Sequence, residues 1–251
     1  MLVMGILNVT PDSFADGGLH YDSDLATARG YEMVEEGVDI IDVGGESTRP
    51  GADRVSQEEE IARTIPVITE LAKHGATISI DTMRASTARA AVKAGAAMIN
   101  DVSGGLADDA MLQTAAELKV PYIAMHWRGQ SKVMNSKAIY EDVVTDVISE
   151  LQERITAALD AGIEVGNLII DPGLGFAKDA EHNWEIIDSI DSFVDLGYPV
   201  LVGASRKRFL GGDSPDEREQ ATIDLTKRLA TTGVWAVRVH SVKPHKEVLS
   251  S

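Results

Sequence analysis

The sequence predicts a single (β/α)₈ barrel of parallel strands, and three observations lead to that fold class. Eight short runs rich in apolar and β-branched residues recur along the 251 residues, separated by stretches of helical character. The runs are nearly continuous in apolar residues, as expected for strands covered on both faces of a parallel sheet. Strict alternation of strand and helix at this chain length is typical of a barrel. A doubly wound open sheet is the alternative fold.

Each expected strand is an apolar run that stops at a polar residue, as the first run stops at Asn8. The strands are expected at residues 2–9, 39–45, 77–82, 98–103, 121–126, 167–171, 199–205 and 234–240.

The helices expected between these strands are recognised by their periodicity and by a glycine just past the end of most of them. They span residues 23–36, 57–73, 85–94, 108–118, 140–161, 182–196 and 215–231, and the glycines are Gly37, Gly75, Gly95, Gly162, Gly197 and Gly233. Few residues follow the last strand, so an eighth helix would be very short or absent. No linker or low-complexity segment interrupts the pattern, which predicts one domain over residues 1–251.

The connection after the first strand is far longer and more polar than a turn requires. A long loop in a compact domain is usually functional and often acts as a lid. We expect Asn8 to be fixed at the strand end. The segment from Thr10 to Gly18, which carries Phe14, is expected to order with substrates and to close together with residues 47–54.

The composition restricts the partners. A formal net charge of −17 disfavours nucleic acid and anionic membrane surfaces, although a local cationic cleft remains compatible with it. Cysteine is absent, which excludes disulfides and thiolate metal sites. No apolar leader or transmembrane stretch is visible, and we expect a cytoplasmic protein.

Polar or charged residues stand at the end of every expected strand. In a barrel these ends meet on one face, which carries the active site. One such residue alone is most often a helix cap or a loop hydrogen-bonding group. Eight together predict a site, and the residues are Asn8, Glu46–Arg49, Asp81, Asn100, Asp101, His126, Asp171, Ser205–Lys207, Arg238 and His240.

The residue types at this face indicate two kinds of ligand. Asp81, Asn100 and Asp171 suit a flat heterocycle with amino and lactam edges. Asp81 and Asp171 would alternatively form a general acid–base pair, as in glycoside hydrolases. A phosphate-like anion is also expected, because four groups of positive character share the face: Arg49, Lys207, Arg238 and His240.

Asn8 offers a hard oxygen ligand for Mg²⁺, which takes few protein ligands and fills its shell with phosphate and water oxygens. Other familiar sites are missing from the sequence. It contains no Walker A motif or dinucleotide fingerprint. It has no HExxH motif, and its six histidines are scattered, which disfavours zinc. A GxSxG elbow is also absent.

Two long strings resemble the hallmarks of the dihydropteroate synthase family: NVTPDSFADGG (8–18) and DVGGESTRPGA (42–52). Later blocks agree in the same order, namely SIDT (79–82), INDVSGG (99–105), MHWRG (125–129), IIDPGLGFAK (169–178), GASRKRFLG (203–211) and RVHSV (238–242). The resemblance covers practically the whole chain, and several blocks are most similar to the actinobacterial branch.

The resemblance implies a pterin-binding barrel, usually a homodimer, that joins 4-aminobenzoate to 6-hydroxymethyl-7,8-dihydropterin diphosphate with Mg²⁺. By the family's pattern the pterin would contact Asp81, Asn100, Met125, Asp171, Lys207 and Arg238. The diphosphate would contact Asn8, Thr48, Arg49, Arg238 and His240, with Asn8 also reaching Mg²⁺. The 4-aminobenzoate pocket would contain Phe14, Arg49, Pro50, Phe176 and Ser205.

The mechanism implied by the family begins with loss of diphosphate, which leaves a pterin-stabilised methylene cation for the arylamine to attack. This chemistry needs charge stabilisation and exclusion of water, and it uses no protein nucleophile. The residues expected to carry it are Asp81, Asp171, Lys207, Arg238 and His240. Sulfonamides are expected to inhibit by competing with 4-aminobenzoate.

The chain departs from the family's pattern in three places. Ser241 stands where the family more often has aspartate, the helix at 217–230 is unusually polar, and a long eighth helix is missing. A methyltetrahydrofolate-dependent methyltransferase is the nearest alternative function, and it would not need the STRPG, SRKRF and RVH blocks. A catalytically silent pterin-binding paralogue is the other, and it predicts decay of the anion-binding residues.

Overall fold

Eight parallel strands form the interior of the structure, a computed structural model that describes residues 1–10, 19–46, 54–130 and 134–250. The strands run in the order β6-β5-β4-β3-β2-β1-β8-β7, and a parallel bridge from Ile170 to Val200 joins the two edges of the sheet. Their bounds are β1 Leu2–Asn8, β2 Ile40–Gly44, β3 Ile78–Asp81, β4 Met98–Asp101, β5 Tyr122–Met125, β6 Leu168–Asp171, β7 Leu201–Val202 and β8 Ala236–Val239. The predicted barrel is confirmed, and the doubly wound alternative is wrong.

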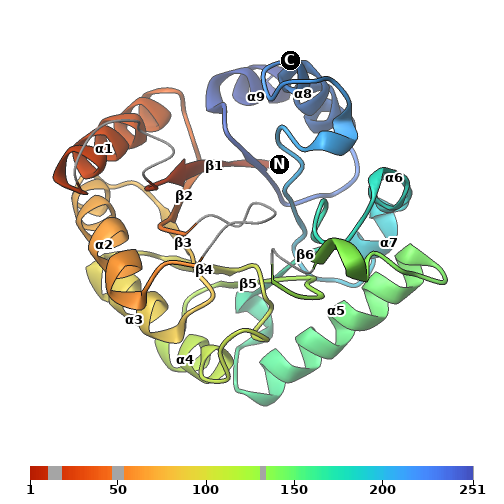
Figure 1. Cartoon of the computed structure of the whole chain (residues 1–251), viewed down its shortest axis with the longest axis horizontal. Helices are drawn as coiled ribbons and strands as arrows, with labels where there is room; N and C mark the ends of the chain where they lie inside the picture. Colours follow the sequence, from red (N-terminus) through yellow and green to blue (C-terminus); the bar gives the residue numbers. More distant parts are fainter. Residues whose placement is uncertain (11–18, 47–53, 131–133, 251) are drawn as a thin grey trace.

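Helices surround the strands as an outer ring (Figure 1). Their bounds are α1 Leu19–Glu35, α2 Gln57–Lys73, α3 Ala85–Ala94, α4 Met111–Leu118, α5 Val143–Asp160, α6 Ala180–Asp188, α7 Ile190–Val194, α8 Glu217–Leu229 and α9 Val242–Leu249, with 3₁₀ turns η2 Met134–Lys137, η3 Val165–Asn167 and η4 Arg208–Leu210. The helix expected at 182–196 is two helices that meet at Ser189. The last helix, α9, has 8 residues.

A plug of apolar side chains fills the lower interior of the barrel, near the amino-terminal ends of the strands. It consists of Met4, Ile40, Met98, Ile123, Ile169, Leu201 and Ala236. Successive side chains of a strand point to opposite faces, so the next inward position lies two residues further on. That position is polar or small in five of these seven strands, namely Asp42, Asn100, Asp171, Gly203 and Arg238, and it is apolar in the other two, Ile6 and Met125. The alternation therefore sets a ring of mostly polar residues directly above the plug.

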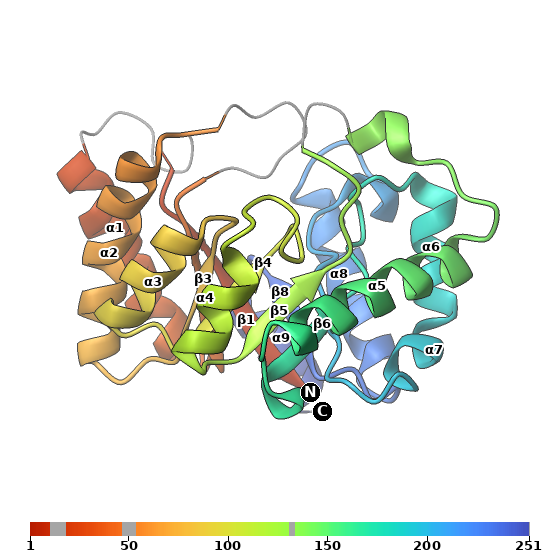
Figure 2. The ribbon, with the colours of Figure 1, turned by 90° about the horizontal axis from the view of Figure 1, so that it is seen from below.

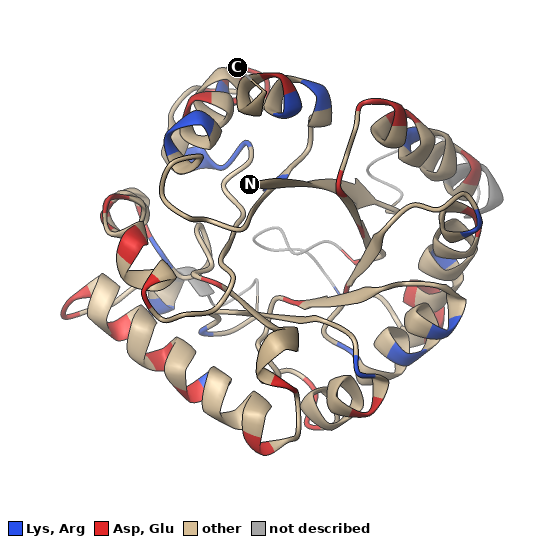
Figure 3. Ribbon diagram, turned by 180° about the vertical axis from the view of Figure 1, so that it is seen from behind, with Lys and Arg blue, Asp and Glu red and all other residues tan. Residues whose placement is uncertain are grey.

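Figure 2 shows the barrel from the side, with the N-terminus at its lower end, so that β1 runs upward. The larger core cluster lies outside the strands, where it packs them against the helices. Acidic residues gather on the outer helices, as on α5 (Figure 3), which agrees with the strongly negative net charge. No helix in the described ranges is long and apolar enough to cross a lipid bilayer.

Candidate active site

Three of four adjacent strands, β1, β3 and β4, bring polar side chains to one level at the carboxyl end of the barrel, and β2 places Gly44 there. The parallel register pairs Asn8 with Gly44, Gly44 with Asp81, and Asp81 with Asn100. A Cβ built on Gly44 would lie 3.8 Å from Asn8 Oδ1 and 3.7 Å from Asp81 Oδ2. The amide oxygen of Asn8 and the carboxylate of Asp81 therefore converge over Gly44, at the position expected for a strand-end site.

Arg238 reaches from β8 across the mouth of the barrel and donates hydrogen bonds to side chains of two other strands, β2 and β3. Its Nε donates to Asp42 Oδ2 at 2.6 Å, and its Nη2 donates to Asp81 Oδ2 at 2.6 Å. Asn100 Nδ2 donates to the same oxygen of Asp42 at 2.9 Å. All four side chains are largely or fully buried. Removing Arg238 would leave two buried carboxylates without a counter-charge.

Two carboxylates share this one guanidinium, and the shortage of positive charge alters their protonation. Burial raises the pKa of Asp81 to about 7; the Arg238 charge opposes the rise, and the neighbouring Asp42 adds to it. Burial disfavours the charged form of Arg238, yet Asp42 and Asp81 hold its pKa above the ordinary value. Arg238 therefore stays charged, and Asp81 gains or loses a proton near neutral pH.

The raised pKa of Asp81 predicts a pH dependence of the stability of the unliganded protein. The protonated carboxyl fits the folded state best, so its contribution is full below the pKa of an unfolded aspartate, about 3.9, and is lost as pH rises through the folded value. We expect the free energy of unfolding, measured by urea denaturation, to fall between about pH 4 and pH 7. An Asp81→Asn variant should show a shallower fall, and an equal slope in both proteins would contradict this assignment.

Asp171 and Lys207 form the other half of the mouth. Asp171 Oδ1 accepts a hydrogen bond from Gly173 N at 2.7 Å, and Lys207 Nζ donates to Leu174 O. The Lys207 ammonium also lies 4.7 Å from the centroid of the Phe176 ring. Burial lowers the pKa of Lys207 to about 8, although the charge of Asp171 counteracts it. The pair therefore offers an acceptor and a donor whose charges depend on each other.

His240 directly follows β8, and Ser205 lies in the segment after β7 that also carries Lys207. Ser205 Oγ lies 2.9 Å from His240 Nδ1 and accepts a hydrogen bond from His240 N at 3.2 Å. Because Ser205 is two residues before Lys207, this contact ties the end of β8 to the chain that carries the lysine.

Arg206, between Ser205 and Lys207, points away from the mouth and has a φ of 58°. Its Nε donates to Glu219 Oε2 at 2.7 Å, and its Nη2 donates to Ser241 Oγ at 2.8 Å. The polar face of α8 thus supplies the carboxylate that holds Arg206, while Ser241 contributes a neutral acceptor. A salt bridge with Glu219 therefore accounts for this side chain.

The expectation that the polar groups at all eight strand ends share one site is wrong for several of them. Glu46 accepts hydrogen bonds from Arg54 and Arg84 outside the barrel. Asp101 accepts from Tyr122, and the buried His126 contacts Glu150 on α5. The cause is the strand alternation: Asp101 follows the inward Asn100, and His126 follows the inward Met125.

Only some of the site residues expected from the sequence belong to the part of the chain that the structure describes. Asn8, Asp81, Asn100, Met125, Asp171, Phe176, Ser205, Lys207, Arg238 and His240 belong to the described residues, at the carboxyl ends of the strands and in the segments that follow. Phe14, Thr48, Arg49 and Pro50 lie outside the described residues, as do most of the two segments expected to close over the site. Asp42 is not among the ligand-binding residues expected from the sequence. It follows the inward-pointing Ile40 by two residues, and this spacing predicts that its side chain also points into the barrel.

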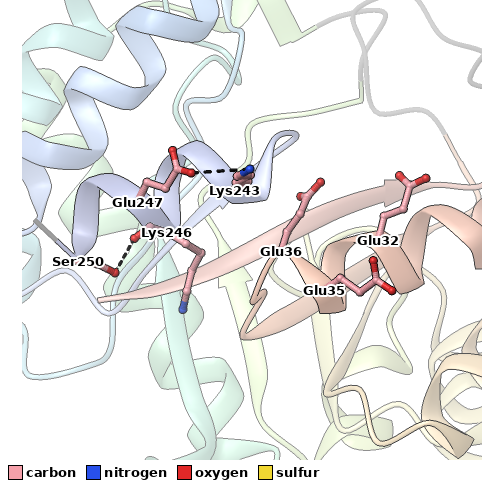
Figure 4. A pocket seen from close by; sticks show the side chains of 7 residues that line it. All are labelled: Glu32, Glu35, Glu36, Lys243, Lys246, Glu247 and Ser250. Carbon is pink, nitrogen blue, oxygen red and sulfur yellow. Dashed lines mark hydrogen bonds and ion pairs between the residues drawn. The ribbon is translucent and has the colours of Figure 1, made fainter.

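A separate hollow of about 700 Å³ lies on the outer surface between α1 and α9 (Figure 4). It is lined by Glu32, Glu35, Glu36, Lys243, Lys246, Glu247 and Ser250. Several of these charges are paired, as Lys246 is with Asp39 at 2.9 Å and Glu36 with Arg29 at 2.9 Å. The hollow is therefore a salt-bridged junction of two helices, remote from the ring of inward polar residues.

Comparisons with known proteins agree with this arrangement. Residues 4–240 match the family described as "Pterin binding enzyme". The dihydropteroate synthase of Mycobacterium leprae is 48% identical over 98% of this chain and 90% of its own length.

Solved structures give the same result. The chain is similar to Xanthomonas albilineans dihydropteroate synthase with 4-aminobenzoic acid, with a TM-score of 0.93 and 43% identity over 99% of this chain and 90% of that one. The same enzyme in complex with 7,8-dihydropteroate has a TM-score of 0.89 and 40% identity over 99% and 91% of the two chains. The Yersinia pestis enzyme in a sulfonamide complex has a TM-score of 0.93 and 38% identity over 99% and 92%. The barrel, its ring of inward polar residues and these likenesses together show that the chain belongs to the dihydropteroate synthase family of pterin-binding enzymes.

Proposed function

We propose that this barrel is a dihydropteroate synthase, which condenses 6-hydroxymethyl-7,8-dihydropterin diphosphate with 4-aminobenzoate to give 7,8-dihydropteroate and diphosphate. The observation that carries the proposal is the mouth itself. It joins the buried acceptors Asp81 and Asp171 to the cations Lys207 and Arg238, in a chain 48% identical to a dihydropteroate synthase.

The pterin would be recognised by pairing each polar edge with a buried partner. The amino and ring N–H donors of the pterin would face Asp171 and Asp81, and its lactam oxygen and ring nitrogen would face Lys207 and Asn100. Buried polar groups left unpaired are costly, so a ring lacking these edges would be rejected. Met125, which is 3% exposed and two residues above the plug residue Ile123, would supply an apolar contact at the ring.

The diphosphate would lie between Asn8 at the end of β1 and Arg238 and His240 at the end of β8, since these two strands are neighbours, and we assign Thr48 and Arg49 to the same group. The donor set suits Mg²⁺: Asn8 offers one hard amide oxygen, and this metal takes most of its ligands from phosphate and water. Among the described residues there is no cluster of three or more acidic or histidine ligands, which also fits a metal held mainly by its substrate. Bound Mg²⁺ would neutralise charge on the leaving diphosphate.

The reaction would begin with cleavage of the bond between the pterin methylene carbon and the diphosphate oxygen, with the electron pair leaving on diphosphate. The nitrogen lone pair of 4-aminobenzoate would then form the new carbon–nitrogen bond, and the resulting ammonium nitrogen would lose one proton to water. Asp81 and Asp171 would stabilise the cationic intermediate as nearby anions. The ionised form of Asp81 is the one this role requires, so activity should rise with pH through its pKa of about 7.

The 4-aminobenzoate would bind between Phe176 and Ser205, which flank Lys207 in the structure, with Phe14, Arg49 and Pro50 completing the pocket. The proposal is tested by incubating the protein with both substrates and Mg²⁺ and identifying the product by mass. Formation of 7,8-dihydropteroate supports it, and consumption of neither substrate by folded protein would refute it.

Sulfonamides are expected to compete with 4-aminobenzoate. A sulfonamide should raise the KM for 4-aminobenzoate and leave kcat unchanged, because both ligands present an arylamine to the same pocket. The measurement is initial rate at several concentrations of each compound. Inhibition that persists at saturating 4-aminobenzoate would show that the two do not share a site.

Two further expectations stay predictions. The family resemblance favours a homodimer, which sedimentation equilibrium would detect as twice the chain mass of 26.9 kDa. A cytoplasmic location would be tested by cell fractionation.

A further inference from the structure

The segment that follows β6 has an unusual backbone. Gly173, Gly175 and Ala177 all lie in the left-handed region, with φ of 69°, 75° and 49°. A Cβ on Gly173 would fall 2.4 Å from the carbonyl oxygen of His126, so only glycine fits there. Ala177 also has a positive φ, although it is not a glycine. A non-glycine residue holds this conformation only where neighbouring contacts fix it.

This conformation orients the pterin end of the mouth. It turns the N–H of Gly173 toward Asp171 at 2.7 Å and the carbonyl of Leu174 toward the ammonium of Lys207. It also brings the Phe176 ring to 4.7 Å from the same ammonium. The two charged groups expected to receive the pterin therefore take their positions from this segment.

Lys178 holds the segment of residues 173–177 in place through hydrogen bonds to its backbone. Its Nζ donates to the carbonyls of Gly173 and Phe176, each at 3.1 Å, and to His126 Nδ1 at 2.8 Å. These three contacts use every donor of the ammonium. The residue is 8% exposed, so the contacts are made away from water, where they are strongest.

His126 and Glu150 hold Lys178 in turn. Because Nδ1 of His126 accepts from Lys178, its Nε2 carries the imidazole proton and donates to Glu150 Oε2 at 2.9 Å. Burial and the charge of Lys178 lower the pKa of His126 to about 4, which keeps the ring neutral. Burial opposes the charge of Glu150, yet hydrogen bonds from His126 and Arg128 lower its pKa to about 2. A fixed carboxylate on α5 thus anchors Lys178 through His126; burial lowers the pKa of Lys178 to about 7, although the charge of Asp171 counteracts it.

We propose that Lys178 is a positioning residue of the pterin subsite, which sets the segment 173–177 so that Asp171 and Lys207 receive the pterin. The inference rests on the proposed function and deepens it. Lys178 acts on the pterin subsite through the backbone of residues 173–177, whose carbonyls accept its hydrogen bonds. The hydrogen-bonded pair His126 and Glu150 holds Lys178 in place. Its charge also faces Asp171, as do those of Lys207 and Arg238.

The test is calorimetric titration of the pterin diphosphate into the protein with Mg²⁺ and without 4-aminobenzoate. Lys178→Met keeps the length of the side chain and removes its three donors. We expect the dissociation constant to rise by about 10- to 100-fold, since a hydrogen bond to a charged group contributes a corresponding amount. Lys93→Met, at an exposed position of α3, is the matched control and should bind as the wild type does.

A pH series separates positioning from general loosening of the fold, which would weaken binding equally at every pH. Burial raises the pKa of Asp171, and the cations Lys207, Arg238 and Lys178 counteract that rise. Lys178→Met removes one of them, so the pH below which pterin binding is lost should move upward. The pterin needs the ionised acceptor, which fixes this direction.

If Lys178→Met does not fold, Glu150→Ala tests the same series of hydrogen bonds, because Glu150 is a partly exposed residue of α5. It leaves the proton of His126 without its acceptor, and we expect pterin affinity to fall by about 2- to 10-fold. Wild-type affinity and an unmoved acid limb in Lys178→Met, or unchanged affinity in Glu150→Ala, would overturn the inference. Failure of the wild type to form 7,8-dihydropteroate would overturn the proposed function instead.

Discussion

An Arg238→Met variant is expected to lose about 3–5 kcal/mol of unfolding free energy and about 10²- to 10³-fold in kcat/KM for the pterin diphosphate. Both losses have one cause. Arg238 holds the buried Asp42 and Asp81 at 2.6 Å each, so its removal leaves two facing carboxylates without a counter-charge. The same guanidinium is the group assigned to the pterin ring and the departing diphosphate.

The control for Arg238→Met is Arg89→Met on the outer surface. Arg89 pairs with Glu117 at 2.6 Å, but both side chains are about half exposed, so the change in stability should be below about 1 kcal/mol. Denaturant titration gives the stabilities, and steady-state rates give kcat/KM. An Arg238→Met protein as stable and active as Arg89→Met would show that the buried cluster has neither role.

An Asp171→Asn variant is expected to lose about 10²-fold or more in kcat/KM for the pterin diphosphate without losing stability. Asparagine keeps the oxygen that accepts from Gly173 N at 2.7 Å but removes the negative charge. Burial raises the pKa of Asp171, so its ionised form is costly in the folded state, and neutralising it should leave the melting temperature unchanged or raise it. Activity and stability would then change in opposite directions.

Asp188→Asn serves as the comparison for Asp171→Asn, because Asp188 is exposed and pairs only at the surface with Arg228. Its activity should match that of the wild type. If Asp171→Asn kept both normal turnover and normal pterin affinity, the electrostatic role assigned to Asp171 would be wrong.

The fold was predictable because apolar periodicity reports burial, and burial on both faces is what a barrel strand requires. The lengths of the helices and strands were harder to predict from the sequence. Residues 199–205 were expected as one strand, but only Leu201–Val202 form β7, since Gly203 already begins the segment that carries Ser205 and Lys207. The break between α6 and α7 at Ser189 has no glycine or proline to mark it.

The residues of the candidate site also divide into those that the sequence predicts and those that only the tertiary fold brings together. Asn8, Asp81, Asn100, Asp171, Lys207 and Arg238 were visible because the apolar run of each strand stops there. The inward orientation of Asp42 follows from the two-residue period of its strand, in which Ile40 already points inward. The contact of His126 with Glu150 has no local signal, because Glu150 is one of several acidic residues along α5 and only the tertiary fold selects it.

The most direct test of the function is release of diphosphate from 6-hydroxymethyl-7,8-dihydropterin diphosphate, measured with Mg²⁺ at increasing concentrations of 4-aminobenzoate. A dihydropteroate synthase should release diphosphate in step with added 4-aminobenzoate and yield one 7,8-dihydropteroate for each diphosphate. Release that does not depend on 4-aminobenzoate, or no release by folded wild-type protein, would contradict the assignment.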